Sequence, residues 1–255
     1  MPFANIVAAL LRSHLREMKI PPPPLLPAGL APDTTVLTDA QMAIPEEAMP
    51  GKPAGGGIDC LGCIYGMMYR DIGDRVSWRR VTVRGLTRDY DTGEVLLRGY
   101  CHERHAPQHF RASRIQEMVD LSSGESIDQP KAFFARYLSD DPTFRALRAS
   151  GPALQVLAFI ARCDGNELPA ERAMMIKYVR NAHPDMDIDA GLVERHIRAL
   201  LPDEETFQSG LAAFEAMSHE QAVAVVECAI SIVESDGVVG TDERKWLDEI
   251  KAALR

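Results

Sequence analysis

Two loops of the sequence repeat an acidic pattern whose residue types could bind a metal ion. The segment "DGNELPAE" begins at Asp164 and the segment "DGVVGTDE" begins at Asp236, so that Glu171 and Glu243 follow their aspartates by seven residues. Carboxylate oxygens are the ligands that hard cations such as Ca²⁺ prefer. If the fold brings the two loops together, these four carboxylates could coordinate Ca²⁺ or a similar divalent cation.

A structural role explains the same residues. Each Asp-Gly pair lies between two segments of helical spacing, so Gly165 and Gly237 are suited to end the first helix in a left-handed conformation. Glu171 and Glu243 would then lie in the first turn of the next helix, where the helix dipole favours negative charge by about 0.3–1 kcal/mol. The loops are not EF-hands, because the glycine follows the aspartate directly. Cation binding and helix capping both remain open.

A second group of candidate residues is rich in arginine. Residues 58–130 contain 10 arginines, no lysine and 11 acidic residues. Guanidinium groups bind phosphate through two parallel hydrogen bonds, and with an aromatic ring beside them they could hold single-stranded nucleic acid or a nucleotide. The candidate ligand-binding residues are Arg79, Arg80, Tyr100, Arg104, Arg111 and Arg114. In the alternative, the arginines pair with the acidic residues of the same segment.

Strands must position these arginines. Between Cys63 and Leu121, short segments rich in β-branched and aromatic residues alternate with turn residues. The segments 71–74 and 91–93 predict hairpin turns in which Gly73 and Gly93 can adopt a positive φ. Four or five antiparallel strands in about 60 residues favour a small barrel, because closure removes the exposed edges of a sheet.

Helices must position the acidic loops. From Gln129 onward the apolar residues recur at helical spacing. The predicted helices cover residues 130–139, 142–149, 152–163, 169–182, 188–201, 203–216, 219–235 and 241–254. Ser218 and Gln221 fit a capping box at the start of the helix at 219–235.

An amphipathic helix precedes both regions. It covers residues 1–20 and is followed at 21–58 by a Pro/Gly-rich stretch that we interpret as a disordered or extended linker. The helix has one apolar stripe, which could dock on a protein partner, on a membrane surface or on its own chain. The predicted domains are therefore this helix, the linker, a barrel at 59–128 and an all-α domain at 129–255.

Other chemistry is not expected. Cys60 and Cys63 could bind zinc together with Cys101, His102 and His105, but the second half of this set is not a regular pair of ligands, so we do not expect a zinc site. The sequence has no glycine-rich phosphate loop, no His-Glu zinc helix and no nucleophile elbow, and we do not expect an enzyme. The histidines of the predicted helices, His183 and His196, are expected at the surface or at the edge of the core.

The remaining composition indicates the compartment. No run of 18 apolar residues is present, so no membrane span is expected. Five cysteines without an export signal favour reduced thiols and a cytoplasmic location. Residues 131–255 carry 14 basic and 21 acidic residues, a balance that argues against nucleic-acid contact there.

The region from about residue 150 to residue 254 resembles the tellurite-resistance TerB family, which is built from two helical units that each contain Asp-Gly and a Glu seven residues later. The matching positions are Asp164, Glu171, Asp236 and Glu243. The resemblance implies a non-enzymatic, acidic, all-α domain that binds metal ions and acts in bacterial stress or defence assemblies.

The region from Ile64 to Glu125 resembles a WYL domain, a small Sm-like barrel of bacterial regulators and defence proteins. The resemblance is carried by Tyr100-Cys101, Arg104, Phe110-Arg111 and Arg114-Ile115, while Val95-Leu96-Leu97 stands where the family has Trp-Tyr-Leu. It implies a module that senses a nucleic acid or a nucleotide.

We therefore expect an α+β protein of two domains, an antiparallel SH3/Sm-like β-barrel followed by a TerB-like all-α domain. Its expected function is that of a non-enzymatic accessory protein in bacterial stress or phage defence. The barrel would bind nucleic acid or a nucleotide, and the helical domain would bind a metal ion or a protein partner. In the alternative, the protein is a purely structural adaptor in a tellurite-resistance or phage-defence complex.

Overall fold

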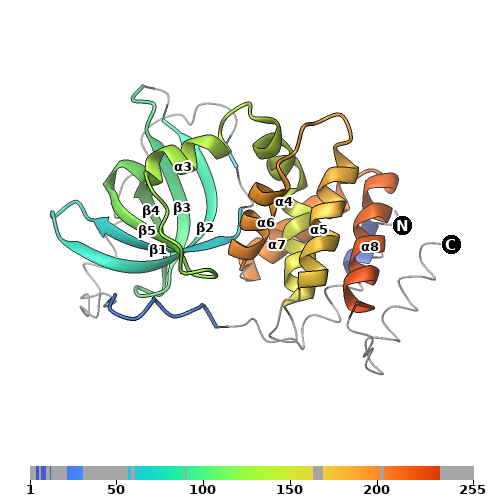
Figure 1. Cartoon of the computed structure of the whole chain (residues 1–255), viewed down its shortest axis with the longest axis horizontal. Coiled ribbons are helices and arrows are strands. Elements are labelled where there is room, and N and C mark those ends of the chain that lie inside the picture. The colour runs from blue at the N-terminus through green and yellow to red at the C-terminus, as the bar shows by residue number, and fades with distance from the viewer. Residues whose placement is uncertain are drawn as a thin grey trace. The chain divides into compact units, whose positions relative to one another are not determined.

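The chain forms two compact units (Figure 1). The structure is a computed structural model that describes residues 4, 5, 7–9, 12, 22–30, 57, 58, 61–89, 91–162, 169–201 and 204–235. One unit comprises residues 22–148 and 198–201 and contains the strands, and we call it the sheet unit. The other comprises residues 1–21, 149–197 and 202–255, and we call it the helical unit.

Five antiparallel strands build the sheet unit. They are β1 (Cys63–Arg70), β2 (Val76–Arg88), β3 (Val95–Cys101), β4 (Ala106–Arg111) and β5 (Ile115–Asp120), and their order in the sheet is β4-β3-β2-β1-β5. The antiparallel β-structure predicted from the alternating segments is confirmed. In the 91–93 turn Gly93 has a φ of 65°, as expected, but in the 71–74 turn the positive φ of 59° belongs to Asp74 instead of Gly73.

The sheet is open, whereas a closed barrel was predicted. Its edge strands are β4 and β5, and no ladder joins them within the described residues. The three-residue 3-10 helix η1 (Ala112–Arg114) nevertheless connects one edge to the other. The edges of a flat five-stranded sheet lie about 19 Å apart, four spacings of about 4.8 Å, so the sheet must curve strongly for this turn to span it. Closure was predicted because it removes edges, but short edge strands of six residues serve the same purpose.

The inner face of the curved sheet holds an aromatic core. Tyr65 of β1 makes edge contacts with Phe133 and Phe134 of helix α3 (Pro130–Tyr137), with ring centroids 5.7 Å apart in each pair. Tyr69 meets Phe110 of β4 at 5.1 Å, and its hydroxyl accepts a hydrogen bond of 3.1 Å from the backbone N–H of Arg111. Because β1 and β4 are not neighbours in the sheet, these contacts across the inner face require its curvature.

The outer face is partly covered by residues 22–30, which lie within the predicted linker. Leu26 and Leu30 pack against a buried apolar cluster formed by Ile64, Trp78, Val119, Leu121 and Leu201. Gly66 permits this approach, because a Cβ there would lie 2.9 Å from a methyl group of Leu26. Residues 198–201 complete the cluster, and the backbone N–H of Leu201 donates to the carbonyl of Gly62 at 2.9 Å.

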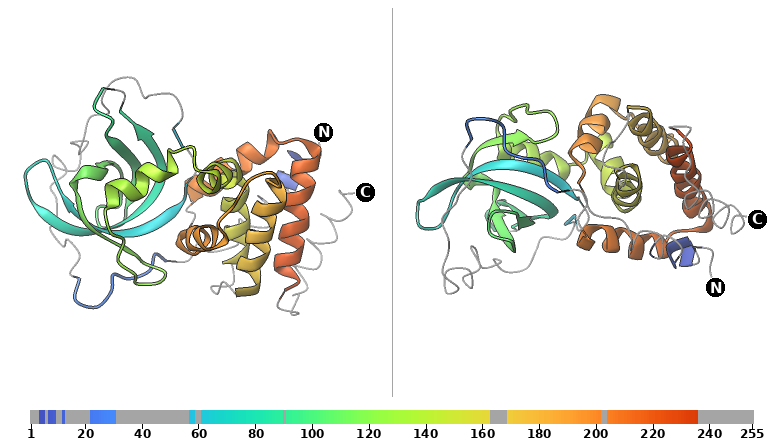
Figure 2. Two further views of the ribbon diagram at one scale, coloured as in Figure 1. Left: turned by 45° about the horizontal axis from the view of Figure 1, so that its top comes forward. Right: turned by 90° about the horizontal axis from the view of Figure 1, so that it is seen from below.

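The described helices of the helical unit follow the predicted ones with one exception. They are α4 (Pro142–Ala161, of which residues 142–148 belong to the sheet unit), α5 (Pro169–Ala182), α6 (Ala190–Ala199, of which residues 198 and 199 belong to the sheet unit), α7 (Glu204–Glu215) and α8 (His219–Val233). Helices α5 and α8 lie side by side (Figures 1 and 2). The predicted helix at 241–254 lies outside the described residues.

The exception is helix α4, where two helices were predicted. It continues through Pro152, although proline cannot donate the backbone hydrogen bond and usually interrupts a helix. Packing against α7 accompanies this continuity, because Gly210 comes so close that a Cβ there would lie 2.9 Å from the carbonyl oxygen of Pro152. Tertiary contact therefore outweighs the local preference.

The capping box predicted at the start of α8 is confirmed. The backbone N–H of Gln221 donates to the Ser218 hydroxyl at 3.2 Å, and the Ser218 N–H donates to the Gln221 side chain at 3.1 Å, which completes the capping box. In the N-terminal helix, Val7 and Ala8 are buried and Arg12 forms a salt bridge of 2.6 Å with Glu215 of α7. We considered a protein partner, a membrane surface and the chain itself as docking sites for this helix. In the structure, its described residues pack on the chain itself.

Within the described part of the chain, no helix combines the length and the apolar character needed to cross a membrane.

Candidate ligand-binding site

Arg79 lies on the inner face of the sheet and is only 1% exposed. Its Nε donates to the Ser77 hydroxyl at 3.2 Å, and its Nη2 lies 3.9 Å from a carboxylate oxygen of Asp71. Its guanidinium carbon lies 5.4 Å from the ring centroid of Tyr69. These contacts hold the arginine in the core, where its charge is paired with that of Asp71.

Arg80 points to the outer face and binds one carboxylate. Its Nε donates to Glu103 Oε1 and its backbone N–H donates to Glu103 Oε2, both at 2.6 Å. Its Nη1 donates to the carbonyl oxygen of Pro24 at 3.3 Å, in the stretch that covers the outer face. Arg80 therefore ties β2 to the β3–β4 turn and to residues 22–30, as the structural alternative for the arginines expects.

The other predicted ligand-binding residues lie at different places in the sheet unit. Arg104 lies in the β3–β4 turn, Arg111 ends β4 and Arg114 lies in η1, and all three are partly buried. The Arg104 backbone N–H hydrogen-bonds the thiol of Cys101, whose pKa is raised by burial to about 11. The six predicted residues thus lie on the inner face, on the outer face and in the turns, and the charges of Arg79 and Arg104 both act on the Cys101 thiol.

The structure brings a different group together around Tyr100 on the outer face. The guanidinium carbon of Arg84 lies 5.2 Å from the Tyr100 ring centroid, and the ring of His102 meets Tyr100 edge-on at 5.3 Å. His102 Nε2 is hydrogen-bonded to the Thr82 hydroxyl at 2.8 Å. Arg84 lies at the β-bulge between Val83 and Gly85, and a bulge of this kind redirects a side chain out of strict alternation.

Arg98 and His109 extend this group across β3 and β4. They pair directly in the ladder, two residues along β3 from Tyr100 and therefore on the same face of the sheet. The Arg98 guanidinium lies beside Gly85, 3.4 Å from the position of an added Cβ, while the Ile58 carbonyl oxygen, 2.6 Å from that position, requires glycine there. Burial, and secondly the charge of Arg98, lower the pKa of His109, so this imidazole is neutral near pH 7.

We call these side chains the outer-face cluster, defined as Arg84, Arg98, Tyr100, His102 and His109. Two guanidinium groups beside a phenol and two imidazoles can bind a phosphate and stack a planar ring. Of the predicted ligand-binding residues, only Tyr100 belongs to the cluster. Arg98 and Tyr100 of β3 and His102 just after it are two residues apart, and this spacing is a signal that could have found part of the cluster.

Of the four predicted metal ligands, only Glu171 lies within the described residues. It is 7% exposed in the first turn of α5, a position that both cation binding and helix capping require. Asp164, Asp236 and Glu243 lie outside the described residues. Among the residues that are described, no group of three His, Cys, Asp or Glu side chains could hold a metal ion. Cys63 and Cys101 are buried, and Cys60 is not described.

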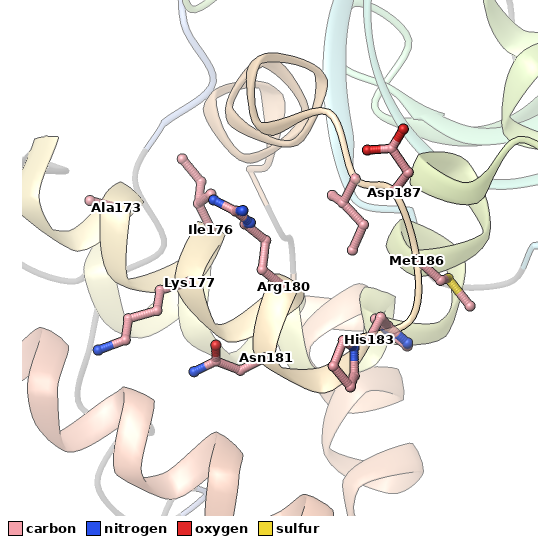
Figure 3. A pocket seen from close by; sticks show the side chains of 10 residues that line it. Ala173, Ile176, Lys177, Arg180, Asn181, His183, Met186 and Asp187 are labelled. Atoms are coloured by element: carbon pink, nitrogen blue, oxygen red, sulfur yellow. The ribbon is translucent and has the colours of Figure 1, made fainter.

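The helical unit has a groove of about 440 Å³ beside α5 (Figure 3). Its residues are Ala173, Ile176, Lys177, Arg180 and Asn181 of α5, with His183, Pro184, Met186, Asp187 and Ile188 of the following loop. His183 Nε2 is hydrogen-bonded at 3.0 Å to the hydroxyl of Ser150, which is 3% exposed. Burial lowers the pKa of His183. The other predicted edge histidine, His196, is instead 3% exposed within the core.

The acidic loops lie within a region that matches a known family. Residues 152–255 match the model of the family described as tellurite resistance protein TerB. This part of the chain is a TerB domain. It contains helices α5 to α8, the C-terminal half of α4 and the α5 groove. No curated protein and no solved structure matches the chain significantly. The WYL resemblance of the sheet unit stays a prediction.

Proposed function

We propose that the protein is a non-enzymatic, cytoplasmic accessory protein of a bacterial stress-resistance or defence system. Its sheet unit binds single-stranded nucleic acid or a nucleotide through the outer-face cluster. Its TerB domain binds a divalent cation or a protein partner. The TerB match over residues 152–255 supports the stress-related part of the proposal.

The placement of the Arg84 guanidinium over the Tyr100 ring, with His102 at its edge, carries the ligand-binding part. Arg84 and Arg98 supply positive charge for a phosphate, while Tyr100 and His102 supply planar surfaces for a base. Stacking on an aromatic side chain contributes about 1–3 kcal/mol per base and tolerates any sequence. The cluster therefore suits a ligand that combines phosphate with a planar ring.

The non-enzymatic part is supported by the Ser150–His183 pair. A serine hydroxyl bonded to an imidazole can act as a nucleophile when a substrate reaches the oxygen. Ser150 is 3% exposed, so its hydroxyl orients the ring of His183 and does not face the groove as a reactive group.

Binding of a labelled single-stranded DNA of 20 thymidines, followed by fluorescence anisotropy between about 50 and 200 mM salt, tests the proposal. Arg84→Ala combined with Arg98→Ala should weaken binding at least tenfold. It should also reduce the slope of log K against log salt by about 1.4, which is about 0.7 for each of two lost phosphate contacts.

Arg88→Ala is the matched control, because Arg88 is an exposed arginine at the end of β2 outside the cluster. It should leave affinity unchanged. Arg84 is 8% exposed, so the thermal unfolding of each variant must be compared with that of the parent. Equal binding by the double variant and the parent protein would refute the ligand-binding proposal.

The structural adaptor is the second candidate function, and the Arg80–Glu103 contact favours it. This arginine, like Arg79, already has a carboxylate partner inside the sheet unit. An adaptor would bind neither DNA nor nucleotides, yet would co-purify with a defined protein. Absence of DNA binding together with such a complex would favour this function.

A further inference from the structure

The α5 groove follows a regular stripe on the exposed side of one helix. Ala173, Ile176, Lys177, Arg180 and Asn181 recur at helical spacing, whereas Met175 and Val179 are buried on the opposite side. From residue 173 to residue 181 the helix rises about 12 Å, at about 1.5 Å per residue. The groove is thus long enough to receive two turns of a helix or about four residues of an extended segment.

The groove concentrates positive charge in an acidic region. Residues 169–201 and 204–235 contain 11 acidic residues and only five arginines or lysines, and two of these five, Lys177 and Arg180, line the groove. They lie one helical turn apart, and both are exposed. Neither forms a salt bridge with another residue among those that the structure describes. Within the described part of the chain, these two cations outnumber Asp187, the one acidic residue of the groove lining.

Apolar side chains lie beside these charges. Ile176 of α5 and Met186 and Ile188 of the facing loop are partly buried and line the groove. Figure 3 shows Arg180 on the helix and Met186 and Asp187 on the loop across from it. Methionine adapts its shape to a partner more readily than branched side chains do. The lining thus offers an adaptable apolar contact next to two cations.

We propose that the α5 groove docks an acidic segment of a partner protein, with two carboxylates one helical turn apart and a large apolar residue beside them. The carboxylates face Lys177 and Arg180, and the apolar residue contacts Ile176, Met186 and Ile188. The helix-in-groove mode of recognition uses such an arrangement of anchors along one face. A small free anion would contact only the exposed cations, whose charges are screened by water and salt.

This inference rests on the partner-binding half of the proposed function and makes no use of the outer-face cluster. Experiments can therefore refute the α5-groove inference and the nucleic-acid proposal independently of each other. Loss of DNA binding would leave the groove untouched, and failure of the groove would leave DNA binding as it was.

The probe is a fluorescein-labelled 12-residue helical peptide with glutamates and leucines on one face, tested against the full-length protein by anisotropy. A matched peptide with glutamine in place of every glutamate should bind at least tenfold more weakly. Affinity for the acidic peptide should fall at least fivefold between 50 and 300 mM salt, as the charges are screened.

Charge reversal locates the site. Lys177→Glu and Arg180→Glu should each weaken peptide binding at least tenfold, whereas Arg195→Glu should not. Arg195 is an exposed arginine of α6 outside the groove, and its reversal changes the net charge by the same amount. Met186→Ala should weaken binding at least threefold without altering its salt dependence.

Several results would overturn the inference. They are no binding of the acidic peptide up to 1 mM, equal binding of the glutamine peptide, or an equal loss in Arg195→Glu. Displacement of the peptide by free glutamate at a similar concentration would assign the groove to small anions instead. Because the reversed residues are exposed, unchanged thermal unfolding of each variant is expected and separates binding from folding.

Discussion

Gly210 of α7 provides a sharp test of the packing in the helical unit. A Cβ at this position would lie 2.9 Å from the carbonyl oxygen of Pro152 and 3.2 Å from the Cβ of Gln155. Real Cβ atoms almost never come within 3.0 Å of another heavy atom, and a carbonyl oxygen inside α4 cannot move without the helix. Gly210→Ala should therefore force the two helices apart.

Two opposing effects set the size of the change. Alanine stabilises a helix interior by about 1 kcal/mol relative to glycine. Overpacking of a close contact costs about 1–3 kcal/mol. Since the contact is with backbone, we place the cost near the middle of that range and expect Gly210→Ala to lower the free energy of unfolding by about 1 kcal/mol.

Gly191 of α6 is the matched control, because its added Cβ would meet only the side-chain oxygen of Asp189, at 3.2 Å. Gly191→Ala should change the free energy of unfolding by less than about 0.5 kcal/mol, because Gly191 is an exposed residue in the first turn of α6. Urea unfolding followed by far-UV ellipticity measures both changes, provided that the slope with denaturant is unchanged. A Gly210→Ala protein as stable as the parent would refute the close approach of α7 to Pro152.

Three further predictions concern charge. Glu103→Gln should lower the free energy of unfolding, measured by urea unfolding, by about 2–3 kcal/mol, because it removes the carboxylate that accepts two hydrogen bonds from Arg80. An unchanged urea midpoint would contradict this role of Glu103. Burial lowers the pKa of His196 to about 4, so the unfolded state binds a proton that the folded state does not. Stability should therefore fall by up to about 3 kcal/mol as the pH drops from about 6.5 to about 4, and His196→Gln should flatten this dependence measured by urea unfolding. Calorimetry of the full-length protein with Ca²⁺, Mg²⁺, Mn²⁺ and Zn²⁺ should give heat of binding that is lost when the four matched carboxylates become amides, and heat that persists would exclude the site formed by Asp164, Glu171, Asp236 and Glu243.

Features set by neighbouring residues could be predicted from the sequence. The turns that join β1 to β2 and β2 to β3, the bounds of α5 and the Ser218 capping box depend on residues within a few positions of one another. The family of residues 152–255 was also accessible, because both Asp-Gly loops keep the same distance to a glutamate.

Features decided by distant residues could not be predicted. Helix α4 continues through Pro152 where it packs against Gly210, a residue 58 positions away (210 minus 152). Glu103 binds Arg80 across 23 positions, and nothing local distinguishes Arg80 from an arginine that awaits a ligand. The bulge at Arg84 depends on how β2 and β3 pair, so the side chain that stacks on Tyr100 was not among the six predicted ligand-binding residues.

The sheet unit is discontinuous in sequence, since it includes residues 198–201 from beyond the start of the TerB domain. Leu201 buries its side chain in the outer apolar cluster, and Leu200 forms a β-bridge with Cys63. A fragment that ends before the TerB domain would leave this cluster short of one side chain and expose Trp78 and Ile64 to water. A fragment of the sheet unit that lacks residues 198–201 should therefore be less stable than the same unit within the full chain.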